Sequence, residues 1–338
     1  MTISAKYGLI DQIEFFDKYV ASKNLKGYYL LKKGEFAYNK SYSNGFPYGA
    51  VKRLDLYNQG AISTLYICFE ITNKINSNFL KIYFDSNKWN KEMYKIAVEG
   101  ARNHGLLNIP INDFFNTKHL FPSISEQEKI ADFLSAIDKK IGFMEKEINK
   151  QSKYMKKIRE NILNDNSDNS NKVQLKEICI INKGKQLNKT NMINDGKYYV
   201  LNGGKTPSGF TNSWNVPENT ISISEGGNSC GFVNYNVQKF YCGGHCYYLT
   251  NISDEIDPLL LYHCLKMNEN KIMNLRVGSG LPNIQKKDLE KYKLYIPTKN
   301  HEKITYLLNN INLKIDLNKE KLNHLKQFKK GLLQKMFC

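Results

Sequence analysis

EKIADFLSAIDKKI (residues 128–141) and EKITYLLNNINLKI (residues 302–315) are two versions of one segment, 174 positions apart. From Ile130 in the first segment onward, large side chains recur alternately every four and every three residues. This seam consists of Ile130, Leu134, Ile137, Ile141, Met144, Ile148, Gln151, Met155, Ile158 and Ile162. Such spacing over more than four heptads is typical of a helix that packs along another helix. The sequence therefore predicts a long helix with a single contact stripe.

The second copy keeps the same spacing and predicts a second long helix. Its seam consists of Ile304, Leu308, Ile311, Ile315, Asn318, Leu322, Leu325, Lys329, Leu332 and Met336. Lys329 interrupts the stripe, and we expect the neighbouring Phe328 to fill the gap. Asn318 is either a device that sets the helix register or a tolerated polar residue. Helices of roughly 35 residues extend on the order of 50 Å at 1.5 Å per residue.

The ends of the first helix are also marked. Ser123 or Ser125, followed by Glu126 and Glu128, forms a capping box with acidic residues at the positive end of the helix dipole. The polar, helix-breaking stretch NDNSDNSN (164–171) follows the helix. Because a whole globular region separates the two helices, we expect them to pair in antiparallel orientation.

A second repeated feature precedes each helix. GLLNIPIND (105–113) returns as GLPNIQKKD (280–288) at an offset of 175, and Pro122 returns as Pro297 at the same offset. AT-rich helical segments can resemble each other by chance. The shared order of a Gly-Leu-x-Asn-Ile loop, a proline bend and a Glu-Lys-Ile helix start argues against chance. The chain is a tandem duplication with halves of roughly 1–170 and 171–338.

The remaining segments have β-prone runs separated by Gly, Ser and Asn loops. Residues 33–52 and 219–236 each carry such a run, and STLYICFEI (63–71) and HCYYLTNI (245–252) are candidate buried strands. The second region opens with VQLKEICIINKGKQ (173–186). The predicted fold class is α+β, with two globular regions separated by two long helices and related by a pseudo-twofold internal repeat.

The chain is strongly basic. Its formal charge is +17, which favours a polyanionic partner. Only four of its 49 basic residues are Arg, and a composition rich in Lys, Asn and Ile also reflects an AT-rich genome. No run of eighteen apolar residues occurs, and an odd count of seven Cys does not suggest a disulfide framework. We expect a cytoplasmic protein that does not enter a membrane.

Motifs for catalysis are missing from the sequence. The eight Pro are never adjacent, so the Asn/Asp-Pro-Pro-aromatic motif of amine methyltransferases is absent, as is a Gly-x-x-x-x-Gly-Lys-Ser/Thr phosphate loop. Cys242, His245 and Cys246, with Cys230, form the one cluster of interest for zinc. Buried thiols in a hairpin explain it better, because zinc sites usually show two close-spaced ligand pairs. We expect no catalytic residue, no cofactor and no metal.

The order of these features resembles a known family. Globular region, proline bend, EQEKIADFLSAIDKKI, long helix, second globular region, second bend and a helix ending in KKGLLQKMF resemble the specificity subunit of type I restriction–modification systems. NGGKTPSGFTNSW (202–214) and KYGLIDQIEFFDK (6–18) also resemble segments of its recognition domains. The resemblance covers essentially the whole chain.

The resemblance implies a non-catalytic subunit that reads a bipartite site in double-stranded DNA. It implies two methyltransferase subunits docked on the helices, and restriction/translocase subunits that complete the complex. The expected parts are a first target-recognition domain (1–122), a first spacer helix (123–164), a linker (165–172), a second target-recognition domain (173–297) and a second spacer helix (298–338).

One departure concerns the first domain. Family members usually open it with a segment like residues 173–186, whereas this sequence opens with MTISAKYGLI. A truncated allele, a recombined variant or an alternative start would each explain this departure, and the first domain is expected to lack its initial strands. The alternative function is a truncated or recombined, partly inactive fragment that serves mainly in assembly.

The family offers no template for base contacts, because these vary with the target. We select polar loop positions near glycine, where the backbone can approach DNA. The candidates are Lys40, Ser41, Tyr42, Ser43, Asn44, Arg102, Asn103, His104, Asn202, Lys205, Ser224, Glu225, Asn228, Ser229, Arg276 and Ser279. Arg102 and Arg276 both stand shortly before the repeated Gly-Leu-x-Asn-Ile segment. They either bind guanine or phosphate or brace the loop internally; for any single loop, an ordinary hairpin turn is an equal alternative.

Overall fold

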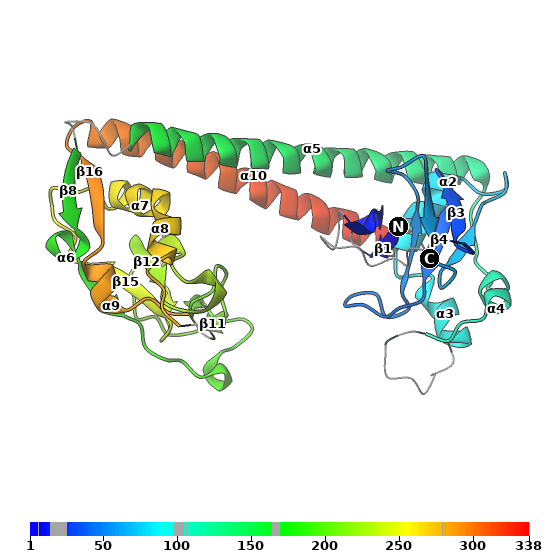
Figure 1. Ribbon diagram of the computed structural model, residues 1–338, viewed down its shortest axis with the longest axis horizontal. Helices are drawn as coiled ribbons and strands as arrows, with labels where there is room; N and C mark the ends of the chain where they lie inside the picture. The colour runs from blue at the N-terminus through cyan, green and yellow to red at the C-terminus, as the bar shows by residue number, and fades with distance from the viewer. Residues whose placement is uncertain are drawn as a thin grey trace. The chain divides into compact units, whose positions relative to one another are not determined.

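The computed structural model (Figure 1) describes residues 1–5, 7–13, 26–97, 105, 107–163, 170–278, 280 and 282–337. The chain forms two compact units. Unit 1 comprises Met1–Glu145 and Lys321–Cys338, and unit 2 comprises Lys146–Glu320. Both units contain helices and strands, so the predicted α+β class is confirmed.

Two long helices, α5 (Ile124–Ile162) and α10 (His301–Met336), contribute to both units. Ser123 caps α5, since its Oγ accepts a hydrogen bond from the Glu126 backbone N–H at 3.4 Å. None of the twenty predicted seam positions is exposed; each is buried or half-buried. The predicted contact stripe is therefore confirmed on both helices.

The helices run antiparallel within each unit. In unit 1, Asp138 and Glu145 of α5 bind Lys329 and Lys326 of α10, each pair at 2.6 Å. In unit 2, Gln151 accepts from Asn318 at 3.0 Å, and Arg159 donates to Asn312 at 3.0 Å. Residue numbers rise on α5 as they fall on α10, which confirms the antiparallel prediction.

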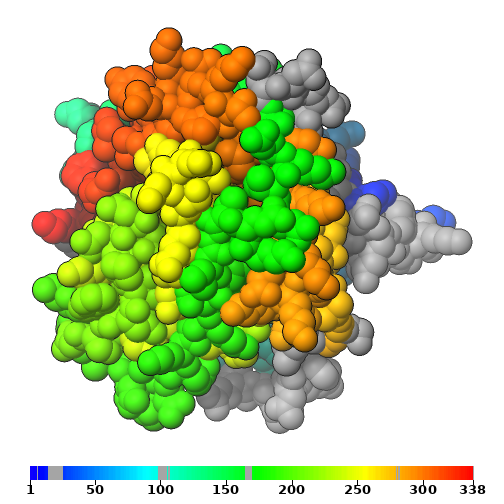
Figure 2. Space-filling model, turned by 90° about the vertical axis from the view of Figure 1, so that its left-hand side faces the viewer, coloured from blue at the N-terminus to red at the C-terminus, as the bar shows by residue number. Residues whose placement is uncertain are grey.

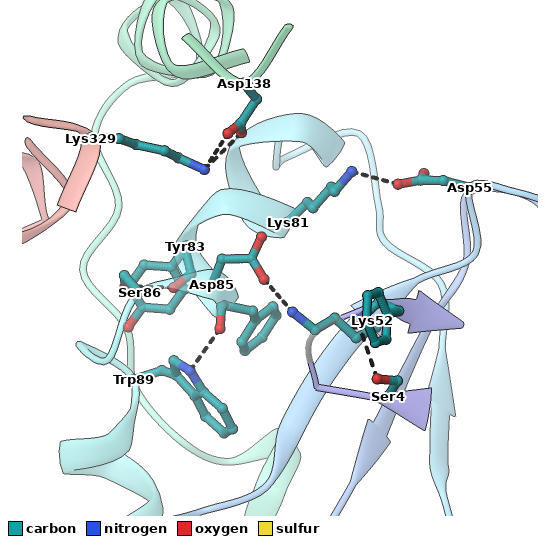
Figure 3. A network of polar contacts seen from close by, with 12 residues as sticks. Ser4, Lys52, Asp55, Lys81, Tyr83, Asp85, Ser86, Trp89, Asp138 and Lys329 are labelled. Atoms are coloured by element: carbon teal, nitrogen blue, oxygen red, sulfur yellow. Dashed lines mark hydrogen bonds and ion pairs between the residues drawn. The ribbon is translucent and has the colours of Figure 1, made fainter. Parts of the chain in front are cut away.

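The expectation for Phe328 is wrong. Its side chain is 54% exposed, whereas Lys329 is only 18% exposed and binds Asp138 (Figure 3). A lysine can occupy an apolar seam because its alkyl stem packs there while its ammonium reaches outward to a carboxylate.

Unit 1 is built on a three-stranded antiparallel sheet in the order β5-β4-β7. Its strands are β4 (Phe36–Asn39), β5 (Ala50–Arg53) and β7 (Ile67–Phe69). Two further antiparallel pairs, β1–β2 and β3–β6, accompany it. The remaining elements are β1 (Thr2–Ser4), β2 (Gly8–Ile10), β3 (Tyr29–Lys32), β6 (Gln59–Ile62), α2 (Ser77–Asp85), α3 (Asn90–Ile96) and α4 (Ile111–Phe115).

An aromatic core joins the sheet of unit 1 to its helices. Tyr38 and Trp89 are almost completely buried and meet edge to face at 5.6 Å. The Trp89 indole donates to the Phe84 carbonyl at 3.1 Å. Lys52 of β5 binds Asp85 of α2 at 2.5 Å (Figure 3). Buried rings with satisfied polar tips fix α2 against the sheet.

Unit 2 has a four-stranded sheet in the order β13-β12-β15-β9, antiparallel throughout. Its strands are β9 (Ile180–Lys183), β12 (Thr220–Ser224), β13 (Val233–Asn236) and β15 (Cys246–Thr250). β8 (Ser170–Gln174) pairs with β16 (Lys293–Pro297), and a third sheet has the order β11-β10-β14. The remaining elements are α6 (Leu175–Ile178), β10 (Tyr198–Leu201), β11 (Gly209–Thr211), β14 (Tyr241–Cys242), α7 (Pro258–Met267), α8 (Glu269–Met273) and α9 (Lys286–Glu290), with 3-10 turns η1 (Lys189–Asn191) and η2 (Gly227–Ser229).

The strand predictions differ in accuracy. Residues 245–252 contain β15, but residues 63–71 form only the short β7, and Leu65 there is 66% exposed. β8 begins at Ser170, inside the stretch expected to be a linker. Among the described residues, no helix is long and apolar enough to cross a membrane.

Each long helix ends in a buried apolar residue. Leu163, directly after α5, is 2% exposed in the core of unit 2. Phe337, directly after α10, is 5% exposed in the core of unit 1, with its ring 5.4 Å from Phe79 and 5.6 Å from Tyr83. The two residues are 174 positions apart, at the offset of the helical repeat.

Candidate nucleic-acid interface

In unit 1, the loop after the central strand lies beside the repeated Gly-Leu-x-Asn-Ile segment. β4 ends at Asn39, and the chain continues through the candidates 40–44. The Tyr42 N–H donates to the Gly105 carbonyl at 2.6 Å, and the Leu107 N–H donates to the Lys40 carbonyl at 3.0 Å. Candidate residues and repeated segment, some 65 positions apart, thus form one structure.

This loop presents three of its five candidates to solvent. Tyr42 is 60% exposed, and Ser43 and Asn44 are also exposed. Lys40 and Ser41 are half-buried, and Lys40 donates to the carbonyl of Ile109 at 3.4 Å. Lys40 therefore helps to fasten the loop, while Tyr42–Asn44 form its outer surface.

Unit 2 repeats this arrangement. β12 ends at Ser224, and the following loop pairs with the second copy of the repeated segment. The Gly227 N–H donates to the Pro282 carbonyl at 3.0 Å, and the Ile284 N–H donates to the Glu225 carbonyl at 2.9 Å. In both units, the loop that leaves the central strand is therefore held by the same repeated sequence.

Two candidates of unit 2 are buried rather than exposed. Ser224 and Glu225 are each 4% exposed. Glu225 Oε1 accepts from Lys183 Nζ at 2.8 Å and from the Tyr247 hydroxyl at 3.0 Å. Burial, together with this carboxylate, raises the pKa of Tyr247, so the hydroxyl stays protonated. Glu225 acts as an internal fastening of the loop.

The other candidates of unit 2 lie at or near the surface. Lys205, Asn228 and Arg276 are exposed, and Asn202 and Ser229 are half-buried. Asn202 Oδ1 accepts from the His245 N–H at 3.1 Å, which ties its loop to residues 243–245. Gly243 stands so close that a β-carbon there would lie 2.5 Å from Asn202 Oδ1. Only glycine allows this approach.

Arg102 and Arg276 were expected either to bind DNA or to brace the loop internally, and the structure bears on this choice for Arg276. Val277 and Asn283 exchange backbone hydrogen bonds at 2.9 and 3.0 Å and close the hairpin without a side chain. The exposed Arg276 side chain is thus available for an external contact. Arg102, Asn103, His104 and Ser279 lie outside the residues that the structure describes.

One pair in unit 2, an exposed ring with a half-buried lysine, is missed by the search for polar positions beside glycine. Lys239 Nζ lies 4.7 Å from the ring centroid of Trp214, and Trp214 is 44% exposed. A cation over an accessible indole combines phosphate attraction with a flat apolar surface. The signal in the sequence is weak, because 25 positions separate the two residues.

The cysteine cluster has the character of a protein core. Cys230, Cys242 and Cys246 are at most 2% exposed, while His245 is exposed. The Cys242 thiol donates to the Cys246 carbonyl at 3.4 Å. A hydrogen bond with Cys246, and then burial, raises the pKa of Cys242 and disfavours the thiolate that binds metals. Among the described residues, no three His, Cys, Asp or Glu side chains are grouped to hold a metal.

Sequence comparisons place this architecture among known proteins. Residues 167–327 match the family described as type I restriction modification DNA specificity domain. A putative type I specificity subunit of Mycoplasma pneumoniae is 41% identical over 129 residues, which cover 38% of this chain and 34% of that protein. A putative type I specificity subunit of Mycoplasma genitalium is 33% identical over 140 residues, covering 40% and 36%. The matched part is thus about a third of the length of these curated relatives.

Structural comparisons extend over most of the chain. The crystal structure of a type I restriction–modification S subunit from M. genitalium matches with a TM-score of 0.67 and 19% identity, covering 93% of this chain and 85% of that one. A chain from a structural study of type I complex assembly matches with a TM-score of 0.54 and 16% identity, covering 91% and 82%. The long-helix α+β fold is shared with these solved structures, and residues 167–327 match the DNA specificity domain that gives the family its description: the chain is similar to type I restriction–modification specificity subunits.

Proposed function

We propose that this protein reads two short tracts of double-stranded DNA, one with the loop after β4 in unit 1 and one with the loop after β12 in unit 2. The observation that carries the proposal is the shared construction of the two loops. Each is fastened by backbone hydrogen bonds to a copy of the same Gly-Leu-x-Asn-Ile segment and presents exposed polar side chains. A loop that is fastened to a fixed segment and exposes polar side chains is suited to base contacts in a DNA groove.

The charge of the chain supports the same function. A net charge of +17 supplies non-specific attraction to phosphates. The exposed Lys205 and Arg276 and the half-buried Lys239 add cations to unit 2. Phosphate contacts position a protein on DNA, and the polar loop residues then discriminate bases.

The long helices offer a surface for partner subunits. In unit 2, Tyr306, Leu313 and Leu317 of α10 are 74%, 59% and 50% exposed. Spacings of seven and four residues place them on one helix face, opposite the seam that packs on α5. An exposed apolar stripe marks a protein interaction site. We propose that methyltransferase subunits dock on the helices, two per chain, and that restriction/translocase subunits complete the complex.

The chemistry then belongs to the partners. Neither the family description nor the names of the relatives include a catalytic activity. We propose that the chain is a non-catalytic subunit without its own cofactor, acting in the cytoplasm where the DNA of the cell is found.

The test is DNA binding by the full chain together with its methyltransferase subunits. We expect sequence-selective retardation of a duplex that carries two tracts about one helical turn apart, with affinity that falls steeply as salt rises. The triple variant Tyr42→Ala, Ser43→Ala, Asn44→Ala should lose selectivity for one of the two tracts and keep assembly. A complex that assembles but shows no sequence-selective binding would support the rival function, an assembly fragment that does not read DNA.

A further inference from the structure

A cavity of unit 2 lies between α5 and the pair of helices α7 and α8. It has a volume of about 240 Å³ and is lined by Lys156, Arg159, Glu160, Lys266, Met267, Glu269 and Asn270. The helix α10 packs nearby: in Figure 2 its orange start lies above the yellow of the chain that leads into α7. Three of the lining residues are basic, so the cavity is a candidate site for an anion.

Arg159 is a half-buried cation at this cavity. Its Nε donates to His263 Nδ1 at 3.3 Å, its Nη2 donates to Asn312 Oδ1 at 3.0 Å, and Tyr262 is a further hydrogen-bond partner. These partners are uncharged, since burial lowers the pKa of His263 to about 3 and raises the pKa of Tyr262. Burial also lowers the pKa of Arg159. A guanidinium taken out of water among neutral groups lacks the counter-charge that normally accompanies a buried cation.

The carboxylates that act on Arg159 have partners of their own. Glu269 and Asp316 raise the pKa of Arg159 electrostatically, against the larger effect of burial. Glu269 Oε2 accepts from Lys266 Nζ at 2.5 Å, and Asp316 Oδ1 accepts from Lys319 Nζ at 2.8 Å. Each of these acids is matched by a lysine, so the charge of Arg159 is left in excess.

Lys156 lies at the exposed side of the cavity. Its side chain is 72% exposed, and Glu160, one turn further along α5 and 52% exposed, lies 3.9 Å away. Exposed pairs at this spacing contribute little to stability. The Lys156 ammonium can therefore turn to an anion that enters the cavity beside Arg159.

The ring of Phe232 links this cavity to the loop after β12. Phe232 closes that loop, since its N–H donates to the Ser229 carbonyl at 2.9 Å and its carbonyl accepts from the Ser224 N–H at 2.9 Å. Lys266 Nζ lies 3.9 Å from the centroid of this ring, and Lys205 Nζ lies 5.9 Å from it. Two lysines from distant parts of the chain thus flank one aromatic ring at the end of the loop.

Positive charges are crowded along this surface. Burial lowers the pKa of Lys266, the Glu269 carboxylate acts against this, and the charges of Arg159 and Lys205 lower it further. Lys205, Lys266, Arg159 and Lys156 form a basic row that leads from the loop after β12 to α5. An anion bound along the basic row would relieve the repulsion between its members.

We infer that the cavity beside Arg159 is an oxyanion site, and that it holds a phosphate of the DNA backbone next to the tract that unit 2 reads. The inference rests on the proposed reading of DNA and names where the duplex is held. Arginine has five N–H donors in a planar fork and binds phosphate well. The basic row favours DNA over a single carboxylate of a partner, because it offers several cations in sequence and a DNA strand presents its charges in sequence.

Lys156 provides a variant that spares the fold, because its side chain is largely exposed. The full chain with its methyltransferase subunits is titrated with a duplex that carries the bipartite target. Lys156→Gln should lower the slope of log K against log salt by about 1 and leave the preference for the target over a scrambled duplex unchanged. Lys150→Gln is the matched control, since this exposed cation lies on α5 roughly 120° around the helix from Lys156; it should leave the slope unchanged.

Neutral methylphosphonates, placed one at a time along the duplex, locate the phosphate. In the wild-type complex, one position or two adjacent positions should weaken binding about tenfold. The same replacement should weaken binding by Lys156→Gln less than about threefold, because part of the interaction is already absent. Arg159→Lys keeps a cation but loses the fork of donors, and it should reduce the effect of the same position.

Three outcomes would count against the inference. Selective binding in which Lys156→Gln and Arg159→Lys keep the wild-type slope and the wild-type methylphosphonate profile would overturn it and leave the proposed function intact. Weaker assembly of Lys156→Gln with the methyltransferase subunits in the absence of DNA, with an unchanged methylphosphonate profile, would also overturn it, because the anion would then be a carboxylate of a partner. No sequence-selective binding by the wild type would contradict the proposed function and, with it, this inference.

Discussion

Asn318 of α10 donates a hydrogen bond to Gln151 of α5 at 3.0 Å, at the one place in unit 2 where both helices carry a polar residue in the seam. The pair gives Asn318 a defined role: it can be satisfied only when these two positions face each other. A polar pair in an apolar seam lowers stability but sets the register.

Replacing one residue of this pair should lower the free energy of unfolding more than replacing both. Asn318→Leu leaves the half-buried Gln151 amide without its partner and should lower the free energy of unfolding by about 1–2 kcal/mol. The double variant Gln151→Leu, Asn318→Leu should recover or exceed the wild-type value, as measured by urea denaturation. Asn310→Leu, at an exposed position of α10, is the control. A double variant less stable than Asn318→Leu would contradict a register role.

The end of α10 should anchor it in the core of unit 1. Phe337→Ala removes a ring that is 5% exposed and should cost about 3 kcal/mol of unfolding free energy. Phe328→Ala is the same change on the same helix at a residue that is 54% exposed, and it should cost less than about 0.5 kcal/mol. Equal losses in thermal or urea denaturation would show that the terminal ring is not a core residue.

His263 should make unit 2 sensitive to acid. Burial, and then the nearby Arg159 charge, lowers the pKa of His263 to about 3; its ring Nδ1 accepts from Arg159 Nε at 3.3 Å. The unfolded chain takes up a proton near pH 6.5 and the folded chain does not, so stability is complete above that pH and falls below it. Between pH 7 and pH 5 the loss should be about 2 kcal/mol.

The measurement compares wild type with His263→Gln, which does not titrate. The variant should lose about 2 kcal/mol less between pH 7 and pH 5 than the wild type does, whatever its stability at pH 7. Parallel pH profiles of the two proteins would mean that the pKa of His263 is the same in the folded and the unfolded chain.

Arg276 should contact DNA and not its own hairpin. Arg276→Gln in the assembled complex should weaken binding, and the slope of log K against log salt should fall by about 1 if the partner is a phosphate. A base contact should instead relax selectivity at one position of the target, by about 1–3 kcal/mol. Lys176→Gln, an exposed cation on α6, is the control. Unchanged affinity, slope and selectivity would leave Arg276 without a DNA contact.

The long helices could be predicted from the sequence because one physical rule governs them. A stripe of large side chains at three- and four-residue spacing has to be covered, and all twenty predicted positions are covered. The rule does not decide which of two adjacent residues enters the seam when the residue at the seam position is polar. For this reason Phe328 was expected in the seam, where Lys329 lies. Short strands such as β7 follow local periodicity poorly, because pairing with β4 and not composition determines their bounds.

The candidate site was predictable only in part. Polar residues beside glycine locate the loops after β4 and β12, but not which side chains point outward. Glu225 and Asn228 have similar surroundings in the sequence, yet Glu225 is buried by Lys183 and Tyr247, which lie 42 and 22 positions away. Trp214 and Lys239 were missed for the same reason. Whether a loop side chain is buried or exposed depends on contacts with residues that are distant in the sequence.

The most direct test of two readers in one chain is to change one loop at a time and determine the methylated sequence in cells that carry the complete system. We predict that Tyr42→Ala, Ser43→Ala, Asn44→Ala relaxes or abolishes recognition of one half of a bipartite target and preserves the other half, and that Asn228→Ala, Arg276→Gln does the reverse. Loss of the same half with both variants, or an unchanged target with both, would contradict the account.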